Sequence, residues 1–138
     1  GDALATADVV VCATLATEPL FTAERLRPGA TVVAVGSFDR HRCEIGPDLL
    51  RASHNVVVDH APTARQNCGP LVAARARDDA VEPDLLEIGR VLTGRETARG
   101  SDDDIVTYLS AGLGVQDAAA AWAVYRRAEA HGVGRQVG

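Results

Sequence analysis

Three short apolar runs constrain the fold of this 138-residue chain more than any other feature of its sequence. They cover Val9 to Ala13, Thr31 to Val35 and Asn55 to Val58, with starts roughly 22 to 24 residues apart. Uninterrupted apolar runs suit strands that are buried on both faces of a parallel sheet. Parallel strands need crossover segments, and short amphipathic stretches at Thr22 to Leu26 and Pro47 to Ala52 supply them. The sequence therefore predicts an α/β fold around a three-stranded parallel sheet.

The second half of the chain is predicted to be mainly helical. Gly69-Pro70 ends the repeating pattern, and residues 73–82, rich in Arg and Asp, are expected to form a solvated loop or turn. Pro83 stands where a first helical residue should, and apolar residues recur from there to Gly94, which predicts a helix. Between Gly112 and His131 the helical spacing is clearest, and Gly132 should end that helix as a left-handed cap. The run from Ile105 to Leu109 looks extended instead.

The composition argues against several classes of partner. With a net charge of −5 and 4% aromatic residues, the chain is poorly suited to bind nucleic acid by charge or by stacking. No apolar run approaches the roughly 18 residues of a membrane span, and no signal peptide opens the chain, so we expect no membrane contact and a cytoplasmic location. Cys12, Cys43 and Cys68 show no CxxC spacing, and no metal site is predicted.

The ends of the first two predicted strands form the candidate ligand site. In a doubly wound parallel sheet, ligands lie beyond the carboxyl ends of the strands. Thr14 and Ser37 offer hydroxyl groups there, and Gly36 lets a backbone approach a flat ring closely. Ordinary loop chemistry is the other interpretation of the same spacing. Neither GxGxxG nor GxxxxGK[ST] occurs, so the pyrophosphate cradle of a dinucleotide site is not expected in this chain.

Several ordered blocks resemble the ornithine cyclodeaminase and mu-crystallin family over nearly the whole chain. The blocks are ATLATEPLF from Ala13, Val33-Ala34-Val35-Gly36-Ser37, Glu44-Ile45, Val57-Val58-Asp59, Glu87-Ile88-Gly89, Ser101-Asp102-Asp103 and Ser110 through Asp117. Because the chain contains no Met and opens on Gly1, we expect a fragment. The resemblance implies part of a Rossmann-like sheet followed by C-terminal helices, with the phosphate-binding loop and the substrate-binding Arg and Lys outside this chain.

The resemblance also implies a function and two segments. Residues 1–80 would be the C-terminal half of a Rossmann-type NAD(P)-binding domain, and residues 81–138 a helical segment that packs toward the substrate and dimerisation domain. The intact protein would be a homodimeric ketimine reductase or amino-acid dehydrogenase that uses NAD or NADP and acts on an amino acid or cyclic imine. The fragment alone should be inactive. Two alternatives remain: an ammonia-releasing ornithine cyclodeaminase with bound NAD, and a non-catalytic mu-crystallin-like protein that holds NADPH or another small ligand.

Residue roles follow from the same resemblance. In cyclodeaminases and related alanine dehydrogenases, an aspartate two places after the glycine equivalent to Gly36 is a general acid-base group. Here Phe38 occupies that place, which favours a reductase, although a one-residue shift of the loop would bring Asp39 inward as the catalytic carboxylate. The residues expected along the cofactor are Thr14, Leu15, Val35, Gly36 and Ser37, and those expected to shape the substrate pocket are Phe38 and Leu113.

Overall fold

A five-stranded parallel sheet forms the centre of the computed structural model, which describes residues 2–76, 83–135 and 137. The strand order is β1-β2-β5-β3-β4. The strands are β1 (Val9–Cys12), β2 (Thr31–Ala34), β3 (Asn55–Val58), β4 (Leu85–Glu87) and β5 (Val106–Leu109). The helical elements are η1 (Ala23–Arg25), α1 (Pro47–Ala52), α2 (Ala61–Asn67), α3 (Gly69–Arg75), α4 (Ile88–Leu92) and α5 (Gly114–Ala130). The predicted α/β class is confirmed, but the predicted strand count of three is too low.

The two additional strands come from the second half of the chain. β4 replaces the first part of the helix that was predicted between Pro83 and Gly94, so that prediction is wrong there. Leu86 pairs with Val57 of β3, and only the following residues coil, as the short helix α4. Non-local pairing with β3 decided between two conformations that the local spacing fits equally well. β5 confirms the extended conformation expected around Leu109 and pairs on both sides, with β2 and β3.

Helices α2 and α3 follow β3 directly. Gly69-Pro70, expected to end the repeating pattern, instead begins α3. Proline is tolerated in a first helical turn because the N–H that it lacks has no intrahelical partner there. The loop predicted over residues 73–82 therefore starts inside α3, and its part from residue 77 on lies outside the described residues. The predicted segment boundary after residue 80 lies outside them too and stays a prediction, although β4 and β5 extend the same sheet.

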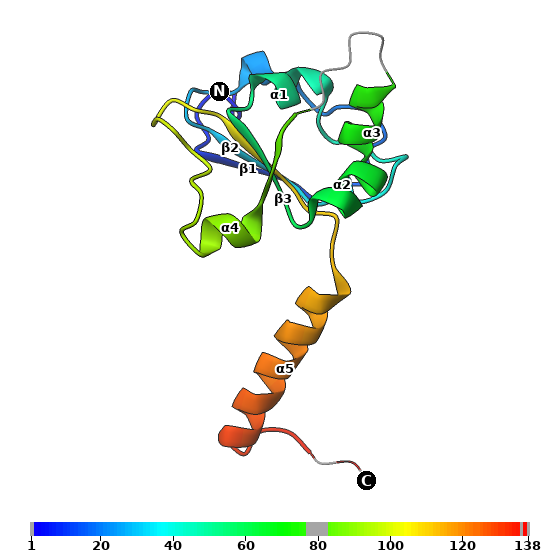
Figure 1. The fold of residues 1–138 in the computed structure, drawn as a ribbon, viewed down its shortest axis with the longest axis vertical. Helices are drawn as coiled ribbons and strands as arrows, with labels where there is room; N and C mark the ends of the chain where they lie inside the picture. The colour runs from blue at the N-terminus through cyan, green and yellow to red at the C-terminus, as the bar shows by residue number, and fades with distance from the viewer. Residues whose placement is uncertain (1, 77–82, 136, 138) are drawn as a thin grey trace.

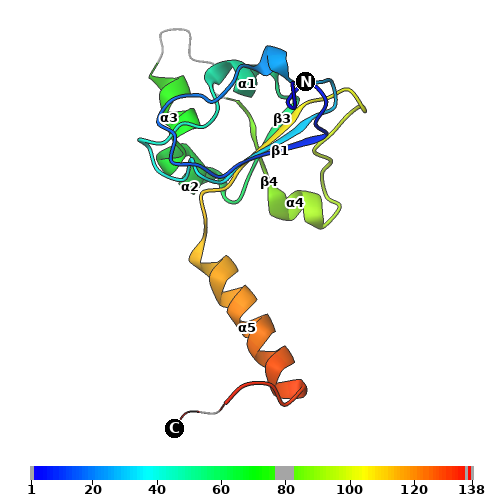
Figure 2. The ribbon, with the colours of Figure 1, turned by 180° about the vertical axis from the view of Figure 1, so that it is seen from behind.

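The two faces of the sheet are covered unequally. Helices α1, α2 and α3 lie over one face, and α4 lies on the other (Figures 1 and 2). On the first face, Val32, Val58 and Leu109 are wholly buried and form the main core. On the second face, a smaller cluster around Val57 and Leu86 packs under α4. The helices thus leave the β1 end of the second face open.

Strand β1 forms an open edge of the sheet. Within the described chain it pairs with β2 alone. Val9 and Val11 on its uncovered face are 59% and 63% exposed. An exposed apolar edge strand presents unpaired peptide groups on which another chain can add a strand.

We expect Val11→Arg to reduce self-association of this chain, because a charged side chain on an edge strand opposes pairing between edges. Light scattering over a series of protein concentrations should show the apparent mass of the unchanged chain rising above 14.4 kDa, with a smaller rise for the variant. Leu92→Arg is the control, since Leu92 is equally apolar and exposed but lies on α4. Identical concentration dependence of the two variants would contradict the prediction.

Helix α5 projects away from the sheet and has no buried residue (Figure 1). Its position agrees with the helix predicted between Gly112 and His131, and Gly132 follows it with a φ of +62°, as expected for a left-handed cap. Trp122 and Tyr125 stack on one another at a ring separation of 5.5 Å, and Trp122 is 61% exposed. Residues 118–121, four alanines that would permit close helix packing, are also exposed. Within the described chain α5 therefore presents an uncovered surface.

Candidate functional site

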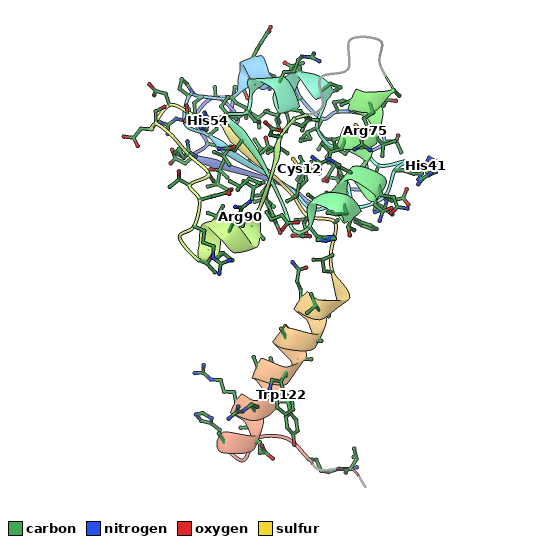
Figure 3. All side chains as sticks on the ribbon, viewed as in Figure 1. Cys12, His41, His54, Arg75, Arg90 and Trp122 are labelled. Carbon is green, nitrogen blue, oxygen red and sulfur yellow. The ribbon has the colours of Figure 1, made fainter. Side chains whose placement is uncertain are left out.

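The carboxyl ends of β1 and β2 lie side by side because the two strands are parallel and in register. Cys12, the last residue of β1, pairs with Ala34, the last residue of β2. Beyond them, the Val35 N–H donates a hydrogen bond to the Cys12 carbonyl at 2.9 Å. Cys12 is labelled in Figure 3 and marks this end of the sheet. The loops that carry the predicted cofactor residues therefore start from the same edge, which we call the carboxyl edge: the ends of β1, β2, β5 and β3.

Glu44 joins these two strand ends. Its side chain is wholly buried. Oε1 accepts hydrogen bonds from the Thr14 N–H (2.5 Å) and the Thr14 hydroxyl (2.8 Å). Oε2 accepts them from the Gly36 N–H (2.8 Å) and the Ser37 hydroxyl (3.3 Å), and the Ser37 Oγ accepts one from the Glu44 N–H (2.9 Å). Both carboxylate oxygens are thus occupied by donors from the two ends, which fixes one end relative to the other.

Gly36 is enclosed by the same contacts. A Cβ atom at this position would lie 2.1 Å from the Thr14 carbonyl oxygen and 2.5 Å from Glu44 Oε1. Only glycine leaves room for this approach of one loop to the other. The glycine that was predicted to admit a flat ring is therefore already required by packing within the chain, and its contact with a ring stays a prediction.

Apolar side chains flank the two strand ends that Glu44 holds together, which we call the braced strand ends. Leu15 is 73% exposed and Val35 is 38% exposed, so both offer surface to a ligand. Ser37 is almost completely buried, and its hydroxyl donates a hydrogen bond to Glu44 Oε2. Exposed apolar side chains next to fixed peptide groups are the kind of surface that binding of a planar ring requires. The residues present suit the nicotinamide end of a dinucleotide, whereas the sequence offers no glycine-rich loop for its pyrophosphate.

The loop after Ser37 places Phe38 and Asp39 on the outside of the molecule. The Phe38 ring is half exposed, and the Arg42 guanidinium lies over it, 4.7 Å from its centroid, as a cation–π pair. Asp39 is exposed, and its Oδ1 accepts a hydrogen bond from the His41 N–H at 2.9 Å. The Asp39 carboxylate thus stabilises a local turn. Its catalytic role stays a prediction.

A second carboxylate, Asp59, lies at the end of β3 on the carboxyl edge. Tyr108 Oη donates to its Oδ1, while the Ser110 hydroxyl (3.0 Å) and the Gly112 N–H (2.8 Å) donate to its Oδ2. Burial by itself would raise the pKa of Asp59, but these hydrogen bonds stabilise the charged form and hold the pKa below its ordinary value of 3.8. Burial, together with the Asp59 contact, raises the pKa of Tyr108 to about 12.

The Asp59 cluster fixes the segment that leads to α5. Gly112 has a φ of +71°, a conformation that glycine adopts without strain, and its N–H points to Asp59. Leu113 follows directly, is half buried, and donates its N–H to Gln116 Oε1 at 3.1 Å. Because β5 lies between β2 and β3, this segment leaves the sheet next to the Gly36 loop. The structure therefore brings Leu113 to the same edge as the predicted cofactor residues.

Glu44 and Asp59 received no functional role from the sequence, although both belong to blocks that carried the resemblance. For Asp59 a signal existed, since it directly follows a predicted strand and so had to lie at the carboxyl edge. For Glu44 there was none. It lies in a loop eight residues after Gly36, and only the folded chain shows that it is buried between two strand ends.

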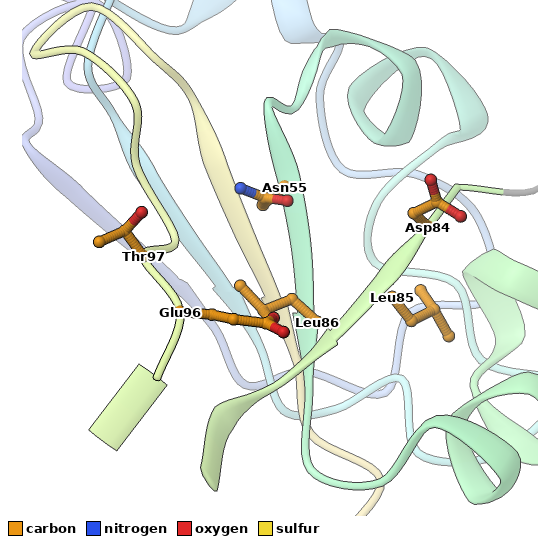
Figure 4. A pocket seen from close by; sticks show the side chains of 6 residues that line it. All are labelled: Asn55, Asp84, Leu85, Leu86, Glu96 and Thr97. Carbon is orange, nitrogen blue, oxygen red and sulfur yellow. The ribbon is translucent and has the colours of Figure 1, made fainter. Parts of the chain in front are cut away.

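A cavity of about 360 Å³ opens at the opposite end of the strands (Figure 4). Its lining residues are Asn55, Asp84, Leu85, Leu86, Glu96 and Thr97. Asn55 and Leu85 begin β3 and β4, so the cavity belongs to the amino end of the sheet. Since ligands of doubly wound sheets bind at the carboxyl ends, it is not part of the candidate site.

Among the residues that the structure describes, no group of His, Cys, Asp and Glu side chains is arranged to hold a metal ion. In the same part of the chain, no helix has both the length and the apolar character that crossing a bilayer requires.

Comparisons with known proteins agree on one family. Residues 1–132 match the model of the ornithine cyclodeaminase/mu-crystallin family. A delta(1)-pyrroline-2-carboxylate reductase of Bacillus cereus is 31% identical over 138 residues, which cover 99% of this chain and 42% of that protein. The structure of a probable ornithine cyclodeaminase from Bordetella pertussis Tohama I has a TM-score of 0.83 at 40% identity, covering 96% of this chain and 43% of that one.

A further solved structure carries ligands. Delta(1)-pyrroline-2-carboxylate reductase of Thermococcus litoralis, in complex with NADH and L-proline, has a TM-score of 0.84 at 27% identity and covers 99% of this chain and 42% of its own. The present chain thus spans about two fifths of the length of the relatives that it matches.

Proposed function

Since the chain belongs to the ornithine cyclodeaminase/mu-crystallin family, we propose that the protein is an NAD(P)-dependent oxidoreductase that interconverts an amino acid and its imine. One observation carries the proposal: two neighbouring strand ends, Thr14 and Gly36, are locked together by Glu44 at the edge where doubly wound sheets bind ligands. A similar chain of known structure, at a TM-score of 0.84, holds NADH and L-proline. Both observations support a site for a nicotinamide ring and a small amino or imino acid.

In this proposal the chain's own residues hold and shield the reacting groups. A bound nicotinamide cofactor supplies the hydride. The residues that line or support the place of the nicotinamide ring are Thr14, Leu15, Val35, Gly36 and Ser37. Phe38 and Leu113 form apolar walls beside it that exclude water and hold the substrate carbon close.

The proposal assigns reductase rather than lyase chemistry because of Phe38. A cyclodeaminase of this family needs a carboxylate two places after the glycine, and the structure has a half-exposed aromatic ring there, with Arg42 packed on it. Asp39 is engaged with the His41 N–H. The absence of a carboxylate at position 38 and the local engagement of Asp39 both support a reductase.

The test is an activity assay on the full-length protein with delta(1)-pyrroline-2-carboxylate and either NADH or NADPH, followed by the loss of reduced-nicotinamide absorbance. We expect turnover with at least one cofactor. Tight cofactor binding without turnover would point to a non-catalytic binding protein, and release of ammonia from ornithine would point to a cyclodeaminase.

Asp39→Asn separates the reductase from the cyclodeaminase. Because the Asp39 carboxylate already stabilises a local turn, we expect the variant to keep most of the imine-dependent turnover of the unchanged protein. If the carboxylate acts as the general acid-base group instead, turnover should fall by at least about a hundredfold. The exposed Asp102 supplies a control, since Asp102→Asn removes a similar charge from a loop at the amino end of the strands.

A homodimer and a cytoplasmic location are part of the same proposal. The uncovered surface of α5, with Val115, Trp122 and Tyr125 exposed, supports a contact with another part of the assembly. The free thiols of Cys12, Cys43 and Cys68 fit a reducing compartment.

A further inference from the structure

We propose that Glu44 does more than hold the strand ends: its negative charge stabilises the positively charged, oxidised nicotinamide ring relative to the neutral, reduced one. This inference rests on the proposed function, because it requires a nicotinamide ring at the carboxyl edge. It makes Glu44 a residue that tunes the cofactor toward hydride donation.

The Glu44 carboxylate has no ion-pair partner in the described chain. It is wholly buried, and its partners are neutral: the Thr14 N–H and hydroxyl, the Gly36 N–H and the Ser37 hydroxyl. No arginine or histidine of the described chain forms an ion pair with it. A buried carboxylate without a cation nearby keeps a field that solvent screens poorly.

The electrostatic field of the Glu44 carboxylate reaches the end of β1. Burial and, as the smaller cause, the negative charge of Glu44 together raise the pKa of the Cys12 thiol to about 11. Cys12 is the last residue of β1, two places before Thr14. The charge therefore acts on the strand end against which the ring is proposed to lie.

The proposed reaction changes the charge of the nicotinamide ring. Hydride transfer from a reduced nicotinamide to an iminium carbon moves one hydrogen nucleus and two electrons, which leaves a neutral amine and a ring with one positive charge. The step therefore moves one positive charge from the iminium group to the ring, so a fixed negative charge on the side of the ring favours its products and is already in place before it. The same charge should favour binding of the oxidised cofactor over the reduced one.

The test is the ratio of two dissociation constants, measured by calorimetry on the full-length protein. With whichever of NAD and NADP binds more tightly, we expect Glu44→Gln to weaken binding of the oxidised form relative to the reduced form by about tenfold. Glutamine keeps the shape of glutamate but turns an amide N–H₂ toward one of the donors. That disturbance should loosen the strand ends and weaken binding of the oxidised and the reduced cofactor alike. The ratio of the two dissociation constants is then unaffected by it.

Asp104→Asn is the matched control. The Asp104 carboxylate also accepts hydrogen bonds from two backbone N–H groups, those of Gly100 and Ser101, both at 2.8 Å. It lies just before β5, at the amino end of the sheet, so its neutralisation should leave the ratio unchanged. An unchanged ratio in Glu44→Gln, or an equal change in both variants, would overturn the inference and leave Glu44 as a structural brace.

A second measurement avoids any change to the protein, in case Glu44→Gln does not fold. A dinucleotide in which benzamide replaces nicotinamide has a flat aromatic ring of similar shape without the charge. The unchanged protein should bind the oxidised natural cofactor about tenfold more tightly than this analogue, and equal affinity would overturn the inference. If the unchanged protein binds neither oxidised nor reduced cofactor, the proposed function itself is rejected.

Discussion

Gly36→Ala should lower the free energy of unfolding by about 3 kcal/mol, because overpacking of a closely packed site forces the backbone to move. The added Cβ would lie 2.1 Å from the Thr14 carbonyl oxygen and 2.7 Å from the Glu44 carboxyl carbon. The nearest atom belongs to the backbone, so no side-chain rotation relieves the contact. The loops after β1 and β2 must separate, and the hydrogen bonds that Glu44 forms across them must lengthen. We therefore also expect cofactor affinity of the full-length protein to fall by at least tenfold, the equivalent of about 1.4 kcal/mol.

Urea unfolding followed by far-ultraviolet circular dichroism measures the first effect. Tryptophan fluorescence is a poor probe, because Trp122 lies exposed on α5. Gly89→Ala is the control: Gly89 lies in α4, and nothing lies within 4 Å of the Cβ that would be added. Alanine in a helix is favoured over glycine by roughly 0.5 to 1 kcal/mol, so this variant should be as stable as the unchanged chain or slightly more so. Equal stability of the two variants would show that the Gly36 loop is not tightly packed.

The strands that the sequence predicted are those whose own residues are almost all apolar. β1, β2 and β3 are continuous apolar runs, and such runs indicate a strand inside a parallel sheet without knowledge of its neighbours. β4 has only three residues, and the spacing from Leu85 to Leu92 also fits a helix, so its conformation depends on pairing with β3. β5 was seen as extended, but its insertion between β2 and β3 is a non-local choice that no local pattern encodes.

For the candidate site, too, some features could be predicted from the sequence and others could not. Thr14, Leu15 and Gly36 could be predicted, because a residue that follows a parallel strand must lie at the carboxyl edge. The hydrogen bonds of Glu44 and Asp59 could not be predicted, because each connects distant parts of the chain. Thr14 and Glu44 are 30 residues apart, and Asp59 and Gly112 are 53 apart. The sequence thus placed these residues at the carboxyl edge, while the contacts that join the loops there appear only in the folded chain.

Asp59→Ala should destabilise the chain by about 2 kcal/mol at neutral pH, since it removes the charged acceptor of three partly buried hydrogen bonds, donated by Tyr108, Ser110 and Gly112. Urea unfolding followed by circular dichroism again provides the measurement. Asp102→Ala is the matched control, because Asp102 is exposed and its carboxylate accepts no hydrogen bond from the described chain. It should change stability by less than about 0.5 kcal/mol.

The pH dependence distinguishes the charge of Asp59 from its shape. Its pKa in the folded chain lies below 3.8, so its ionised form contributes stability that is fully present above that value. This contribution is lost as the pH falls from 3.8 through the lower pKa of the folded state, where the carboxylate is protonated. The stability difference between the unchanged chain and Asp59→Ala should therefore be constant above about pH 5 and shrink as the pH falls below 3.8. A difference that persists undiminished in acid would mean that Asp59 stabilises the approach to α5 by packing alone, and that its ionised hydrogen bonds to Ser110 and Gly112 contribute little.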